Sequence, residues 1–400
     1  MRLAALVCAL SFCAILVTGC PSKPPTVGAL DKDYDATLPP GQLALRKITD
    51  PRQIPDFTPA CSDLAGLREA VLNSLDYMAK PSSKSHYPYG AVTHEQAVAS
   101  LNAFLALLDS GLPPQQMNQA IRQQFDVYIS VGCDNKGTML YTGYYTPIFQ
   151  ASLAQSDRFR YPLYRAPAGL TKNPDGTPTV KMPDRRTIEQ TNPYAGNELV
   201  WLGDPFEAYV AHIQGSAKLR TAEGQEMTVG YTANNGYDYN SIRAEMAKDG
   251  KIAKRAGLAQ MIAYFKAHPS EVRTYTWRNP RYVFFAPVED GRPRGCLNEP
   301  VTTRRTIATD KAIFPPAGVA FLSPKEAGAI KPGFALDQDA GGAIRAAGRC
   351  DLYMGIGEQA GVTAGRTQEE GKLYYLFLKP QQTHTPGLQQ METPALGAAR

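Results

Sequence analysis

The strongest constraint on how this chain can fold is the segment 336–361, LDQDAGGAIRAAGRCDLYMGIGEQAG, in which carboxylates alternate with glycines. Asp351 lies there in a short strand pattern between two glycines, and glycine lets a backbone turn tightly and approach a ligand closely. Further upstream, Asp310 precedes a Pro-Pro turn and another apolar strand. We therefore expect Asp310, Asp339 and Asp351 to converge around one site.

The amino-acid composition indicates the number of domains and the kinds of molecule that the protein could bind. A chain of 400 residues, 43% of them hydrophobic, favours two domains with sizeable cores. The net charge of +5 only mildly favours a polyanionic surface, and no basic run is interleaved with aromatic residues, so we predict no nucleic-acid partner. The 21 Tyr against 2 Trp suit polar surfaces on which rings can stack, carbohydrate included.

The first twenty residues have the composition of a targeting segment. Arg2 is the charged start, residues 3–17 are apolar, and Thr18-Gly19-Cys20 supplies small residues for cleavage. Residues 17–20 resemble a bacterial lipobox, which implies diacylglycerol on Cys20 and anchoring at the periplasmic face of the outer membrane, because no Asp follows the cysteine. The alternative is an ordinary secretory signal.

Four cysteines remain for the folded part: Cys61, Cys133, Cys296 and Cys350. In an oxidising compartment they can form two disulfides, and chain order suggests Cys61 with Cys133 and Cys296 with Cys350, although the sequence allows three pairings. Neither a CxxC nor an HxxxH spacing occurs, and the five His are scattered. We therefore predict no metal site and no cofactor.

The pattern of the first half predicts a tether, then helices, then strands. Residues 21–60 are rich in Pro, Gly and Asp, which is typical of a linker. Helical spacing runs from Leu64 to Met78, residues 93–96 form a capping box, and a third helix is expected after Pro113-Pro114. Alternating aromatic and polar residues predict strands from Thr138 onward.

In the second half, residues 200–240 are predicted to be strands joined by turns at Glu223-Gly224 and Asn235-Gly236. Helices are expected between Ser241 and about Arg273, and then buried strands up to Leu378. Residues 381–400 are predicted to be a disordered polar tail.

The chemistry of Asp351 depends on its surroundings. Burial among glycines and apolar strand residues would raise its pKa, and a neutral carboxylic acid can donate a proton to a leaving group. Glycoside hydrolysis adds a second carboxylate, for which Asp339 and Asp310 are candidates. The competing interpretation is that these aspartates cap turns, as Asp beside Gly often does.

Several stretches together resemble one family. The segments ATDKAIFPPAG, LDQDAGGAI and CDLYMGIGEQAG are similar to the "3D" (three-Asp) module of the membrane-bound lytic murein transglycosylase A (MltA) family. TGYYTPIFQAS with YPLYRAP, WLGDPFEAYVAHIQGSA and NPRYVFF resemble further segments of that family in the same order, over most of residues 138–380.

The resemblance implies a mainly β fold with N-terminal helices: a discontinuous double-psi β-barrel interrupted by an inserted β-rich domain, with the glycan in the groove between them. The expected boundaries are 61–147 for the helices and first barrel strand, 148–287 for the inserted domain and 288–380 for the rest of the barrel. Glycan strands of peptidoglycan are the implied partner, and cell-wall synthesis or division complexes are candidates.

The resemblance also assigns roles. Asp351 would be the single acid/base of a lyase that cleaves between N-acetylmuramic acid and N-acetylglucosamine and leaves a 1,6-anhydro sugar, with Asp310 and Asp339 in support. Substrate contacts would come from Thr142, Gly143, Tyr144, Gln214, Gly215, Ser216 and Tyr353. Two alternatives stay open: a hydrolytic muramidase that uses two carboxylates, and a peptidoglycan-binding lipoprotein without catalysis.

Overall fold

The computed structural model describes residues 32–173, 177–254 and 256–380. The predicted signal with Cys20 and the predicted tail 381–400 lie outside the described residues. Within them the protein is mainly β with helices, as the sequence predicted. No helix of these ranges is long and apolar enough to cross a membrane.

One sheet closes on itself. Its strands run in the order β1-β2-β14-β11-β12-β10-β13-β3, and β14 also pairs with β3, so the ring from β14 through β11, β12, β10 and β13 to β3 has no free edge. The strands are β1 (Leu45–Lys47), β2 (Phe125–Ser130), β3 (Met139–Thr146), β10 (Thr306–Ala308), β11 (Val319–Pro324), β12 (Gly333–Asp339), β13 (Arg349–Ile356) and β14 (Gln368–Leu378).

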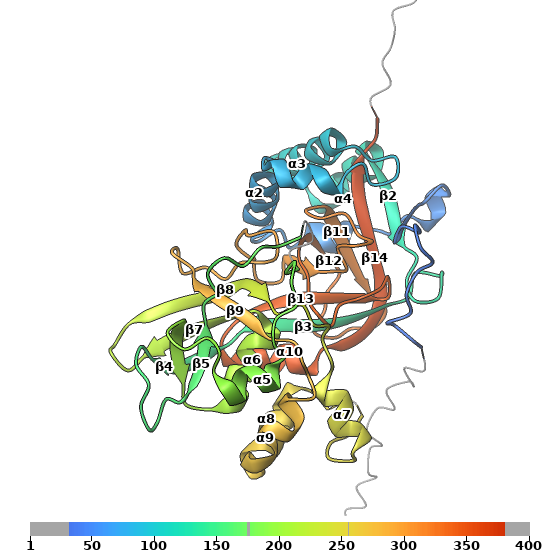
Figure 1. The fold of residues 1–400 in the computed structure, drawn as a ribbon. Helices are drawn as coiled ribbons and strands as arrows, with labels where there is room; N and C mark the ends of the chain where they lie inside the picture. Colours follow the sequence, from blue (N-terminus) through green and yellow to red (C-terminus); the bar gives the residue numbers. More distant parts are fainter. Residues whose placement is uncertain (1–31, 174–176, 255, 381–400) are drawn as a thin grey trace, which may run out of the picture. The chain divides into compact units, whose positions relative to one another are not determined.

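Helices cover part of this barrel (Figure 1). α2 packs on β12, α3 on β11 and β14, and α4 on β2. Thr93 caps α3 by accepting a hydrogen bond from the Gln96 amide, which is one half of the predicted capping box, whereas the Gln96 side chain donates to the Leu378 carbonyl. Phe57, Phe104 and Phe334 fill the space between the helices and the barrel. The helices are α1 (Thr58–Cys61), α2 (Leu67–Met78), α3 (His94–Asp109) and α4 (Pro114–Gln124), with short 3-10 turns η1 (Pro51–Gln53) and η2 (Pro81–His86).

The prediction that residues 21–60 are a tether is wrong for most of that range. From residue 33 onward the chain packs against the barrel: β1 pairs with β2, and Leu45, Ile48 and Phe57 are buried. A few apolar residues spaced among prolines form an edge strand and bury their side chains in the core. The sequence analysis missed them because the segment as a whole has low hydrophobic periodicity.

Chain between β3 and β10 forms a second sheet in the order β5-β6-β4-β7-β8-β9. Its own apolar core includes Leu163, Leu219 and Phe285. The strands are β4 (Ile148–Ser152), β5 (Tyr161–Tyr164), β6 (Glu198–Leu202), β7 (Ser216–Thr221), β8 (Glu226–Asn234) and β9 (Val283–Pro287). The remaining elements are α5 (Arg185–Thr191), α6 (Pro205–Gln214), α7 (Ile242–Lys248), α8 (Leu258–Ala267), η3 (Pro269–Glu271), α9 (Val272–Thr276) and α10 (Glu358–Arg366).

Helix α6 corrects the prediction that residues 200–240 are all strands. The Asp204 side chain accepts hydrogen bonds from two amides of the first turn, Pro205 is the first helical residue, and Gly215 ends the helix in the left-handed conformation with φ 72°. These are helix start and stop signals. The aromatic and β-branched residues inside α6 favoured strand instead.

The predicted disulfides are also wrong. Cys61, Cys296 and Cys350 carry free thiols, so neither predicted pair forms. Cys350 is fully buried in the barrel core, whereas Cys296 lies exposed on the segment that precedes β10, so their side chains occupy different environments. Burial raises the pKa of the Cys350 thiol well above its usual value, which makes it an unreactive core residue.

Candidate active site

Asp351 is the third residue of β13, where it is paired in parallel register with Thr142 of β3 and in antiparallel register with Ala308 of β10. Because side chains alternate along a strand, Cys350 and Leu352 enter the barrel core while Asp351 and Tyr353 point to the other face. The strand that the sequence predicted around Asp351 is therefore confirmed, and the barrel core fixes its backbone on the opposite side.

The Asp351 carboxyl is desolvated. Its Oδ1 and the Thr142 hydroxyl oxygen are both buried without a hydrogen-bond partner among the described residues. Burial raises the pKa of Asp351 to about 7, and the charge of Arg349 and the neighbouring Thr142 hydroxyl oppose that rise. The group can therefore hold a proton at neutral pH and give it to a bound ligand.

Asp339, at the end of β12, has its oxygens engaged. Oδ2 accepts from the Tyr144 hydroxyl at 2.7 Å, and Oδ1 accepts from the amides of Cys296 at 2.9 Å and Ala340 at 2.8 Å. Burial raises the pKa of Asp339, and these three donors oppose the rise. Such an arrangement suits a side chain that positions Tyr144 rather than one that activates water.

Tyr144 connects Asp339 to the second sheet. Its ring packs on Tyr353 with the centroids 5.2 Å apart. The Tyr353 hydroxyl lies 2.8 Å from the Thr146 hydroxyl, which in turn lies 3.1 Å from that of Ser216. This chain of contacts runs from the barrel to the start of β7, so it fixes β3, β13 and β7 against one another.

The end of α6 docks on β3 in the same region. Gln214 accepts a hydrogen bond from the Tyr145 amide at 3.1 Å through its side-chain oxygen. Gly215 then turns the chain into β7, and its carbonyl accepts from the Tyr231 amide. The predicted Gln-Gly-Ser segment therefore joins the two sheets, and Ser216 contributes through Thr146.

Four of the predicted residues line one cavity of about 180 Å³: Gly143, Tyr144, Gln214 and Asp351. Thr142, Gly215, Ser216 and Tyr353 do not line it, and neither do Asp310 and Asp339. Asp310 holds a turn, because its carboxylate accepts from the amides of Ala312 and Ala346. The prediction that Asp310, Asp339 and Asp351 converge around one site is therefore wrong for this cavity, because only Asp351 of the three lines it.

The rest of the lining was not found from the sequence. It comes from α5, α6, β9 and the loops before α7 and β9, and from the turn after β12: Arg185, His212, Ile213, Tyr239, Asn279, Arg281, Val283, Gly341, Gly342, Ala343 and Ile344. Some of these residues stand in stretches that resemble the family, but no spacing signals that they meet.

A further buried carboxylate, Asp337, was missed by the sequence analysis. Asp337 on β12 is fully buried; it accepts hydrogen bonds from the hydroxyls of Thr309 and Tyr375 at 2.7 Å each, and it forms an ion pair with Lys311. Burial raises the pKa of Asp337, and Lys311 opposes the rise. This group is enclosed in the barrel and does not line the cavity at Asp351.

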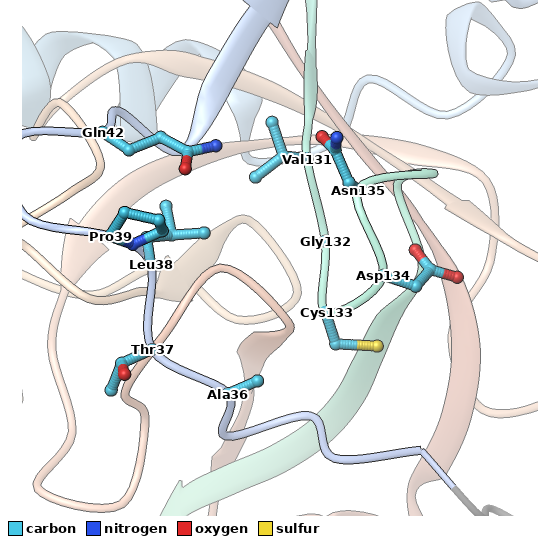
Figure 2. Close-up of a pocket in the computed structure, with 10 residues that line it drawn as sticks. All are labelled: Ala36, Thr37, Leu38, Pro39, Gln42, Val131, Gly132, Cys133, Asp134 and Asn135. Atoms are coloured by element: carbon cyan, nitrogen blue, oxygen red, sulfur yellow. The ribbon is translucent and has the colours of Figure 1, made fainter.

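A larger cavity, of about 250 Å³, has no part in this site. Figure 2 shows its lining, with Leu38 and Pro39 on one side and Val131 and Asn135 on the other. It shares no residue with the cavity at Asp351. Among the described ranges, no group of His, Cys, Asp or Glu side chains is arranged to hold a metal ion.

The sequence is similar to two domain models of one family and to curated proteins of that family. A model of the MltA specific insert domain matches residues 140–286, and a model of the 3D domain matches residues 305–377. The protein called membrane-bound lytic murein transglycosylase A of Escherichia coli K12 is 29% identical over 271 residues, which are 64% of this chain and 70% of that protein.

Two solved structures have the same fold. A membrane-bound lytic murein transglycosylase from Agrobacterium tumefaciens has a TM-score of 0.70 at 25% identity, covering 84% of this chain and 98% of its own. E. coli MltA with bound chitohexaose has a TM-score of 0.66 at 24% identity, covering 90% and 100%. The chain belongs to the family of membrane-bound lytic murein transglycosylase A.

Proposed function

We propose that this protein is a peptidoglycan lytic transglycosylase, which cleaves the β-1,4 bond between N-acetylmuramic acid and N-acetylglucosamine without water. The observation that carries the proposal is the Asp351 carboxyl at the cavity: its Oδ1 is buried without a hydrogen-bond partner among the described residues, and burial raises its pKa to about 7, so that it can hold a proton at neutral pH. The names of its relatives support the same activity.

Asp351 would act twice. As an acid it protonates the bridging glycosidic oxygen, so that the N-acetylglucosamine leaves with the proton. As a carboxylate it then accepts the proton of the muramoyl C6 hydroxyl, whose oxygen attacks C1 and forms the 1,6-anhydro ring. Accepting the C6 proton restores the neutral carboxyl, and no water is consumed, so the reaction is an intramolecular substitution at C1 that we assign to the lyase class.

A single carboxyl is sufficient because the nucleophile belongs to the substrate. Intramolecular attack carries little of the entropy cost of bringing a separate nucleophile to the bond. A hydrolytic muramidase would need a second carboxylate free to bind water. Asp339 has donors on both oxygens, and Asp310 holds a turn, so neither suits that role.

Digestion of purified sacculi tests the proposal. Mass spectrometry of the soluble muropeptides should find 1,6-anhydromuramoyl ends, and Asp351→Asn should yield no product above background. Reducing ends that carry an added water would instead identify a muramidase. Binding to sacculi without any wild-type product would identify a non-catalytic binder, and full activity in Asp351→Asn would reject the role of that residue.

We also propose the arrangement that surrounds this site. The barrel would be a double-psi barrel, and the chain from 148 to 287 would be an inserted domain that supplies the other wall of the glycan groove. Lipid on Cys20 would anchor the enzyme at the periplasmic face of the outer membrane, a proposal supported by the lipobox-like residues and by relatives called membrane-bound. Metabolic labelling with a fatty acid, compared between wild type and Cys20→Ala, tests the anchor.

A further inference from the structure

The wall of the cavity that Asp351 lines also carries hydrogen-bond donors that are not all engaged by acceptors of the described residues. Three side chains supply them: His212 and Gln214 near the end of α6, and Arg281 just before β9. None of the three has a role in the proposed proton transfer. A buried donor without a partner costs about 1–3 kcal/mol, so such a group in a cavity is a sign of a ligand or of ordered water.

Arg185 determines which nitrogen of His212 carries the proton. The Arg185 guanidinium is fully buried, and its Nη1 lies 2.8 Å from Nδ1 of His212. An arginine nitrogen can only donate, so Nδ1 accepts and is unprotonated. Burial, assisted by the charge of Arg185, lowers the pKa of His212 well below its ordinary value, so the ring is neutral and its proton is on Nε2.

The resulting Nε2–H has nowhere to donate within the protein. His212 is 6% exposed, and its Nε2 is buried without a partner among the described residues. Its ring is held by Phe285, which stacks on it at 5.5 Å, and by the edge contact with Tyr282 at 4.3 Å. The donor is therefore fixed in direction before any ligand binds, which lowers the cost of binding an acceptor.

Arg281 adds a positive charge to the same wall. One guanidinium nitrogen, Nη1, donates to the Tyr237 carbonyl at 2.9 Å, and no carboxylate of the described chain lies within ion-pair distance of this side chain. Gln214 uses its side-chain oxygen on the Tyr145 amide, which leaves its NH₂ group as a donor. The wall thus offers a cation and two neutral donors, while the carboxyl of Asp351 lines the same cavity.

From this geometry we infer that the cavity binds the carboxyl-bearing lactyl arm of the muramoyl residue, with Arg281 and the Nε2–H of His212 as its donors. The inference rests on the proposed function, because it concerns the sugar on which Asp351 acts. Muramic acid differs from glucosamine by this O-lactyl group, which is an anion when no peptide is attached. The negative charge of the lactyl carboxylate is complementary to Arg281, which has no carboxylate partner among the described residues, and to the neutral donors beside it. Acetamido and hydroxyl groups are uncharged and do not require a cation in the site.

Binding to an uncleaved ligand separates this inference from the activity. In an Asp351→Asn background, calorimetry would compare peptide-free glycan strands, which carry free lactyl carboxylates, with chitohexaose, which has none. Arg281→Met should weaken binding of the strands by about ten-fold or more, the effect of losing a charge-assisted hydrogen bond, and change chitohexaose binding by less than about two-fold. His212→Phe keeps a ring and removes the donor, and should show the same selectivity with a smaller loss.

Arg220→Met is the matched control, because it removes an exposed arginine of β7 whose one ion-pair partner among the described residues is Glu226. It should alter neither affinity. Equal losses for both ligands in Arg281→Met would overturn the inference and assign the wall to the acetamido groups that both ligands share. Unchanged binding of both ligands would overturn it as well. If His212→Phe fails to fold, Arg281→Met still decides, and the sacculus digest reports independently on the proposed function.

Discussion

The Tyr144 hydroxyl donates a hydrogen bond of 2.7 Å to Oδ2 of Asp339, and through it the barrel carboxylate controls a ring that lines the cavity at Asp351. Asp339 thereby acts on the site without lining the cavity itself. The ring of Tyr144 also packs on Tyr353, whose hydroxyl is tied to Thr146. The ring of Tyr144 is consequently held by Asp339 at the end of β12 and by Tyr353 of β13.

Replacing Tyr144 by Phe tests this relationship. The variant loses the hydrogen bond to Asp339, so we expect a loss of stability of about 1 kcal/mol and a fall in kcat on the order of ten-fold, because the ring is no longer held. The pKa of Asp339 should rise further, since a donor that opposed its rise is gone. Steady-state kinetics and chemical denaturation measure the two effects.

Tyr374→Phe is the control for that variant, because Tyr374 is a buried barrel tyrosine that does not line the cavity. Its kinetics should match those of the wild type. Tyr144→Phe with unchanged kcat would show that the hydrogen bond to Asp339 is only structural.

The pH profile should report on Asp351. A general acid with a pKa of about 7 is protonated below that pH, so kcat/KM on soluble glycan should fall about ten-fold per unit well above pH 7. A profile that stays flat to pH 9 would contradict the acid role.

The pH dependence of folding stability tests the raised pKa of Asp351 independently of the kinetics. The pKa of Asp351 is higher in the folded chain than in an unfolded one, so the folded state binds more protons between about pH 4 and pH 7 and loses stability as the pH rises through that window. Asp351→Asn removes the free-energy cost of ionising this side chain in the folded state. Its Tm should exceed that of the wild type at pH 8, and the gain should shrink or vanish at pH 4.

The buried pair of Lys311 and Asp337 should be essential for folding stability. Lys311→Met leaves Asp337 buried without its cation, and breaking such a pair costs about 3–5 kcal/mol. The double variant Lys311→Met, Asp337→Asn should recover a large part of this loss, because it removes the uncompensated charge. Urea unfolding curves compare the three proteins, and equal losses in the single and double variants would argue against a charge effect.

Gly143 is required by packing. A Cβ at this position would lie 2.9 Å from Cα of Ala364 in α10, closer than atoms can approach without moving the helix backbone. We expect Gly143→Ala to destabilise the protein by about 1–3 kcal/mol. Gly365→Ala, on the same helix, would make only ordinary contacts, the nearest at 3.8 Å, and should be neutral or stabilising. Thermal melts of both variants, measured side by side, test the difference.

Local patterns determined much of the fold. Three of these patterns each specify an element through contacts within a few residues: the capping residue Thr93, the prolines at the start of α4 and the alternation around Asp351. They were predicted because caps, proline and strand alternation act locally. Helix α6 was missed although its caps were legible, since the residues inside it favoured strand, and a similar conflict hid β1 within a segment that resembles a linker.

The residues of the site also fall into those predicted from the sequence and those found only in the structure. The sequence by itself pointed to Asp351 as the proposed acid, because one strand with its flanking glycines and a family-like motif stand together in the chain. Only the tertiary structure decided that Asp339 acts through Tyr144, that Asp310 holds a turn, and that Arg185, His212 and Arg281 meet at the cavity. These residues come from elements far apart in sequence, and their meeting depends on how two sheets pack. No local spacing encodes that packing.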